Sequence, residues 1–168
     1  ILSALLIACS FPSISSGQEF MGLKPDGDLK IAYNYFRSKG FKEATSIEEK
    51  NIVYLIGHVN QQDLELIVAS TPISKQVYRF STFLPKQTDW ADLKASYQKY
   101  FSLLKEKYGP PDASFEEFKR PYHEGEGDEM IAVSSDNCTY SAFWLHRNGI
   151  SMSISVSKFR QVNIIYEN

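Results

Sequence analysis

The chain has 168 residues, which is the size of one compact domain, and 43% of them are apolar and 23% charged. These values are close to the averages of soluble globular proteins and exclude a disordered chain and a membrane-embedded body. The formal net charge is −2 and no cluster of Lys and Arg occurs, so we expect no nucleic-acid partner.

The start of the chain has the character of a secretory leader. Residues 1–11 are apolar, uncharged and too short to span a bilayer. We expect residues 1–17 to be a signal peptide that is truncated at its start, and the small residues 15–17 favour cleavage before Gln18. This route predicts a periplasmic or extracellular protein. The alternative is a lipoprotein box that ends at Cys9, whose acylation would anchor the protein to the outer membrane.

The first half of the expected single domain, residues 18–86, shows one helix and then strands. A turn at residues 25–28 precedes apolar residues at helical spacing, which predict an amphipathic helix that ends at Gly40. Runs with strand character follow, separated by polar or Pro-containing turns, over residues 52–56, 64–69 and 77–84. These runs predict an antiparallel meander.

The second half, residues 87–168, repeats this order. Thr88 is the expected cap of a helix whose apolar side runs from Trp90 to Tyr108 and which ends at Gly109. Strand-like segments follow over residues 115–122, 130–134, 139–147, 150–157 and 161–167. The sequence therefore predicts an α+β fold of two helix-plus-antiparallel-strands halves, a tandem αβββ-like arrangement, with the helices packed on one face of an antiparallel sheet.

Short motifs carry a resemblance to known proteins. They are Gln18-Glu-Phe-Met-Gly-Leu23, Lys39-Gly40-Phe41 and Lys105-Glu-Lys-Tyr-Gly-Pro110, and they resemble a group of uncharacterised small secreted proteins of Bacteroides and relatives. The predicted layout is also similar to that of β-lactamase inhibitor proteins and of small outer-membrane assembly lipoproteins of the BamE type. This resemblance implies a role in protein binding, and it assigns no functional residue.

A hairpin turn sets the expected faces of the last strands. Asn148-Gly149 lies between two alternating runs and predicts a two-residue turn with Arg147 opposite Ile150. Because side chains alternate along a strand, this register directs Phe143 and Leu145 into the core.

The opposite face of this hairpin is then expected to carry large aromatic residues among serines. That composition is unusual for a surface that meets only solvent, and Tyr and Trp are enriched at protein interfaces. We expect this face to bind a protein or peptide. The alternative is that another part of the chain covers the aromatic side chains. The candidate binding residues are Tyr140, Trp144, His146, Ser151 and Ser153.

Signals of catalysis and metal binding are weak. Cys138 is the only cysteine beyond the leader, and we expect it to be a buried apolar side chain rather than a nucleophile. The acidic stretch 123–129 does not match a calcium loop and is expected to be a solvated connection. We expect no metal and no cofactor, and no motif of a hydrolase or nucleotide enzyme occurs. A hydrolase whose carboxylates meet only in space remains the alternative to a non-enzymatic binding module.

Overall fold

A computed structural model gives the structure of the protein and describes residues 19–44, 51–59, 61–147 and 149–168. The predicted leader, Cys9 and Gln18 lie outside these residues. The elements in chain order are α1 (Leu29–Ser38), β1 (Lys42–Glu43), β2 (Ile52–Val59), β3 (Gln62–Ser70), β4 (Val77–Phe83), α2 (Trp90–Tyr108), β5 (Ala113–Phe118), α3 (Glu129–Ser134), β6 (Cys138–Arg147), β7 (Ile150–Ser157) and β8 (Gln161–Glu167).

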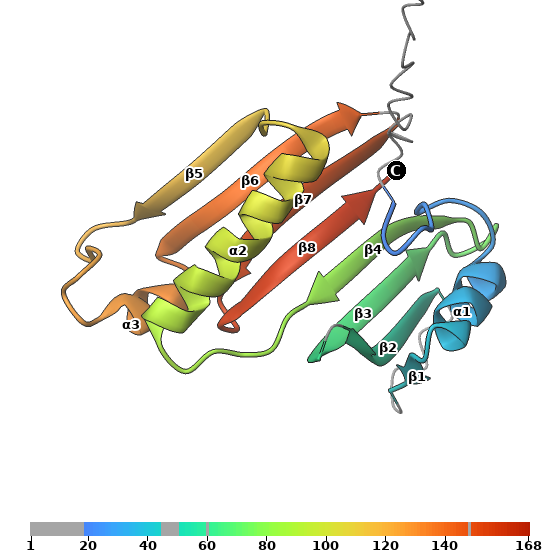
Figure 1. Cartoon of the computed structure of the whole chain (residues 1–168), viewed down its shortest axis with the longest axis horizontal. Coiled ribbons are helices and arrows are strands. Elements are labelled where there is room, and N and C mark those ends of the chain that lie inside the picture. Colours follow the sequence, from blue (N-terminus) through green and yellow to red (C-terminus); the bar gives the residue numbers. More distant parts are fainter. Residues whose placement is uncertain (1–18, 45–50, 60, 148) are drawn as a thin grey trace, which may run out of the picture.

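All of these strands belong to one antiparallel sheet with the order β1-β2-β3-β4-β8-β7-β6-β5 (Figure 1). The α+β class is therefore confirmed. The tandem αβββ arrangement is wrong, because four strands rather than three follow each of α1 and α2, α3 interrupts the second series, and a single sheet joins both. The two series meet where β4 pairs with β8.

The long helices begin and end at the residues that their local chemistry dictates. The Asp28 side chain accepts hydrogen bonds from the backbone N–H groups of Lys30 and Ile31, at 2.8 and 3.4 Å, and so caps α1. Asp89, not Thr88, caps α2 by accepting from the backbone N–H of Asp92 at 2.9 Å. Gly109 ends α2 with a φ of 82°, a left-handed conformation that glycine adopts without strain.

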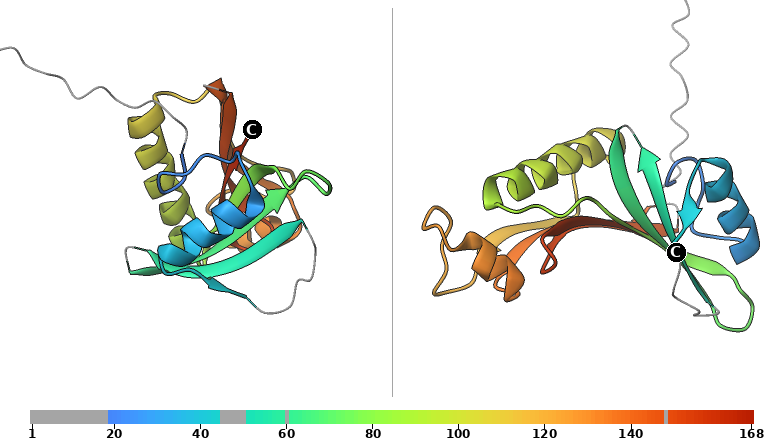
Figure 2. Two further views of the ribbon diagram at one scale, coloured as in Figure 1. Left: turned by 90° about the vertical axis from the view of Figure 1, so that its right-hand side faces the viewer. Right: turned by 90° about the horizontal axis from the view of Figure 1, so that it is seen from below.

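Helices α1 and α2 cover the same face of the sheet. Phe36 of α1 meets Phe80 edge to face with ring centroids 5.3 Å apart, and Tyr97 of α2 meets Tyr140 at 5.6 Å. The strand register sets buried residues of that face in one row, namely Phe80, Tyr166, Met152 and Trp144. Figure 2 shows both helices on one side of a strongly twisted sheet. A continuous hydrophobic core therefore lies between these helices and the sheet.

One predicted element has the wrong type. Residues 130–134 were expected to form a strand, whereas residues 129–134 form the helix α3. A short apolar run does not distinguish a buried strand from a buried helical turn, and here one helical side, Glu129, Ala132 and Val133, is buried. Among the described residues, no helix is long and apolar enough to cross a membrane.

Candidate binding face

An extra residue in β6 reverses the faces that were expected for the side chains of this strand, while those of β7 remain as expected. Arg147 pairs with Ile150, as predicted, but Trp144 rather than Leu145 pairs with Met152, because the register shifts between Trp144 and Arg147. Such a bulge places two residues of one strand opposite one of its partner. Since side chains alternate, this slip of one residue moves the side chains of β6 that lie beyond the bulge, as counted from the turn, to the other face. The expected assignment of faces in β6 is therefore wrong.

The candidate residues consequently separate. Tyr140 and Trp144 lie in the core and are 3% and 0% exposed. The Trp144 indole donates a hydrogen bond from Nε1 to the carbonyl oxygen of Gly109 at 2.8 Å, which ties β6 to the end of α2. Ser151 and Ser153 point to the opposite face, as the register with β8 requires. The side chain of His146 lies outside the described part of the structure. The structure thus does not bring these residues together as one surface.

The face opposite α1 and α2, which we call the open face, carries apolar side chains that stay in contact with solvent. Leu145 is 52% exposed, Phe115 48% and Ile56 45%. Other partly buried members of the open face are Tyr54, Ile67, Phe83, Phe143 and Ile165, and the serines of β7 lie among them. The open face therefore has the mixture of large apolar residues and serines that was expected, with different large residues.

Large and small residues alternate across the open face. The register aligns Ile67, Ser81, Ile165, Ser153 and Phe143 in one row that crosses β3, β4, β8, β7 and β6. The serines leave a groove of about 220 Å³ between the larger side chains, lined in part by Leu145, Ser151 and Glu167. We call it the open-face groove.

An ion pair flanks the open-face groove. Arg79 Nη2 donates to both carboxylate oxygens of Glu167 at 2.9 Å, across the junction of β4 and β8. The side chains of the two residues are 39% and 42% exposed, so water screens much of their attraction. The pair adds a polar rim beside the apolar groove.

The acidic stretch 123–129 fastens α2 to the sheet. Its residues 123–127 are exposed, as expected for a connection. Glu124 nevertheless accepts hydrogen bonds from Lys94, from Trp90 Nε1 at 3.1 Å and from the Tyr140 hydroxyl at 2.9 Å. The hydrogen bonds from Lys94 and Trp90 lower the pKa of the Glu124 carboxyl, against the opposing effect of burial. This carboxylate therefore has a structural role.

Nucleophilic and metal-binding groups do not form a site in the described residues. Burial, and to a lesser extent the charge of Glu124, raises the pKa of the Cys138 thiol to about 12, so the thiol stays protonated and unreactive. His58 contacts Asp63 at 3.0 Å, but this pair is largely exposed. No group of three or more His, Cys, Asp or Glu in the described ranges is arranged to hold a metal ion.

Sequence reasoning missed the apolar residues of the open face, which include Ile56, Phe115, Phe143, Leu145 and Ile165. The strand β8 carried a usable signal, because Val162, Ile164 and Tyr166 alternate along one face, which places Ile165 on the other face with Asn163 and Glu167. Nothing of this kind marks the bulge in β6. No known family, curated protein or solved structure shows a significant match to this chain, so its fold and its candidate site rest on its own residues.

Proposed function

We propose that the protein is a non-enzymatic binding module that holds a protein partner on the open face. The observation that carries this proposal is the exposure of Leu145, Phe115 and Ile56 on one sheet face, opposite the face that the long helices cover. Exposed apolar side chains on a sheet face that no long helix covers favour an interaction site in a soluble protein.

Energetics favour a partner of protein size. Each Å² of apolar surface removed from water contributes roughly 25 cal/mol, and the apolar side chains of the open face are spread from β2 to β5. Only a partner as broad as the sheet can cover them together. The open-face groove offers a pocket for one protruding side chain, and the serines supply hydrogen-bonding groups without adding charge.

The proposal includes export. The leader-like residues 1–17 support secretion to the periplasm or beyond, and the resemblance of the short motifs to small secreted proteins supports the same route. The mass of the N-terminus of the protein from its native cells distinguishes the two routes. A chain that begins at Gln18 supports cleavage of a leader, whereas an acylated Cys9 supports the lipid-anchored alternative.

The experiment begins with capture of partners from envelope and culture-supernatant fractions. Each captured protein is then purified, and its Kd is measured against the wild type and two variants. Leu145→Ser removes an exposed apolar group from the open face, and Phe159→Ser removes one that is 61% exposed in the β7–β8 turn.

We expect Leu145→Ser to raise the Kd about tenfold, because burying an exposed Leu side chain in an interface contributes about 1.5 kcal/mol. Phe159→Ser should leave the Kd within about twofold. Both variants are expected to keep the wild-type circular dichroism spectrum. A purified partner that binds both variants as tightly as the wild type would place its contact elsewhere and refute the open face as the binding site.

A further inference from the structure

The two long helices leave part of their own face of the sheet uncovered. Helix α2 packs against β6, β7 and β8, and α1 packs against β3. The core-side residues near the junction of β4 and β8 lie between these two areas (Figures 1 and 2). Protein interiors are usually packed as densely as organic crystals, so a gap at this place needs an explanation.

This gap contains a pocket of about 120 Å³, which we call the interhelix pocket. Its floor consists of four buried residues, Leu64, Thr82, Leu84 and Ile164. Its rim consists of half-buried residues, namely Phe20, Met21, Val59, Gln62 and Tyr100. The buried floor and half-exposed rim make this a pocket open to solvent rather than an internal packing defect.

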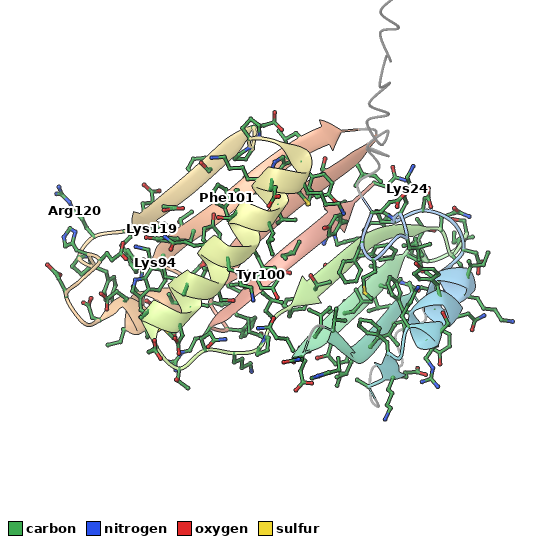
Figure 3. The ribbon with its side chains drawn as sticks, in the orientation of Figure 1. Lys24, Lys94, Tyr100, Phe101, Lys119 and Arg120 are labelled. Atoms are coloured by element: carbon green, nitrogen blue, oxygen red, sulfur yellow. The ribbon has the colours of Figure 1, made fainter. Side chains whose placement is uncertain are left out.

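Hydrogen-bonding capacity is concentrated at one side of the rim. The Tyr100 hydroxyl, on the side of α2 that faces β3 (Figure 3), donates to Gln62 Oε1. Thr82 on the floor is already satisfied, because its hydroxyl donates to the carbonyl oxygen of Ile164 at 3.0 Å. The remainder of the lining is aliphatic or aromatic. The pocket therefore offers an apolar floor and one polar corner.

A strained turn forms another part of the wall. Met21 has a φ of 54°, a left-handed conformation that costs a residue with a side chain about 1–2 kcal/mol. The Tyr35 hydroxyl of α1 holds the turn by donating to the carbonyl oxygen of Met21 at 2.7 Å. On the other side, the Tyr108 hydroxyl of α2 donates to the carbonyl oxygen of Glu19 at 3.4 Å. Such strain is typical of segments that clamp ligands.

We propose that the interhelix pocket binds a small apolar molecule with a single hydrogen-bonding group, of the class of simple phenols. The volume of about 120 Å³ is close to that of a cavity of about 150 Å³ that accepts benzene. The ring lies on the apolar floor and its hydroxyl meets Tyr100 and Gln62. This site is on the helix-covered face, so it is independent of the open face.

The test uses p-cresol and toluene, which have similar shapes and differ by one hydroxyl. Binding is measured on the full chain by titration in ¹H–¹³C methyl spectra, in which the methyl groups of Met21, Leu64, Leu84 and Ile164 report on the pocket. We expect both probes to shift these signals with Kd values of about 0.1–1 mM, which are typical of ligands with few atoms. The methyl groups of Ile56 and Leu145, on the open face, should not shift.

Three variants assign the roles of the residues. Val59→Phe fills the rim and should abolish the binding of both probes. Val156→Phe makes the same change at a half-buried core-side position outside the pocket, and it should leave both Kd values unchanged. Tyr100→Phe should weaken p-cresol about three- to tenfold, which corresponds to the loss of one hydrogen bond, and leave toluene unchanged.

Two results would overturn the proposal. One is the absence of saturable shifts at the pocket methyl groups with either probe, a result obtained on the wild type that does not depend on the folding of a variant. The other is binding of both probes to a folded Val59→Phe variant with the Kd of the wild type.

Discussion

The bulge in β6 makes a quantitative prediction about two adjacent residues. Trp144 is fully buried and hydrogen-bonded to Gly109, so Trp144→Ala should lower the free energy of unfolding by about 3–5 kcal/mol. Phe143 is half-buried on the open face, and Phe143→Ala should cost only about 1 kcal/mol, since the ring keeps much of its contact with water. A regular two-residue hairpin predicts the reverse order, because Phe143 would then face the core.

Urea unfolding followed by circular dichroism measures both differences. At about 2–4 °C per kcal/mol for a chain of this size, the thermal midpoint should fall by about 10 °C for Trp144→Ala and by about 3 °C for Phe143→Ala. The m-values should stay equal, because both variants bury nearly the same surface on folding. A larger loss of stability for Phe143→Ala than for Trp144→Ala would refute the bulge and the two faces that depend on it.

Three further predictions concern the core and the connection between residues 123 and 129. Gly57→Ala should destabilise the protein by about 1–3 kcal/mol in urea titrations, because the added Cβ would lie 2.5 Å from the buried ring of Phe41; stability equal to the wild type would show that this ring can move. The Cys138 thiol should react with Ellman's reagent at pH 8 only after unfolding. The pKa of this thiol is raised from 9.0 to about 12, so its stabilising effect is complete below pH 9 and is lost as pH rises toward 12. The free energy of unfolding of the wild type should therefore fall more steeply between pH 9 and 12 than that of Cys138→Ala. Glu124→Gln should lower the free energy of unfolding by about 0.5–1 kcal/mol at pH 7, because the ion pair with Lys94 is partly exposed. Since the folded carboxyl has a lowered pKa, the difference in stability between wild type and variant should shrink as pH falls below 4.5. A difference that stays constant with pH would argue against this ion pair.

Local signals predicted the elements better than they predicted the faces. The helix α2 could be placed from Trp90 to Tyr108 because its apolar spacing and the glycine at its end act within one segment. The strands β2, β3 and β4 were also found, since each is a short apolar run between turns. The two-residue strand β1 was missed, because two polar residues carry no periodicity.

The residues that β6 contributes to the open face could not be predicted, because they depend on a single inserted residue. The Asn-Gly turn correctly indicated that Arg147 pairs with Ile150. The bulge allows this turn to form while Trp144 packs under α2. The hydrogen bond from Trp144 to Gly109 joins residues 35 positions apart in the sequence. No local pattern reports such a contact. The alternation in β7 was interpreted correctly, so Ser151 and Ser153 lie on the open face while Tyr140 and Trp144 do not.

The place of β8 in the sheet delays folding relative to synthesis. β8 lies between β4 and β7 and follows both of them in the sequence, so the two strand series cannot join into one sheet until β8 has been synthesised. Until then, β4 is paired with β3 alone and lacks a hydrogen-bonded partner on its other side. The nascent chain therefore stays incompletely folded throughout the synthesis of the other strands. An unpaired strand edge of this kind is prone to aggregation until its partner strand is in place.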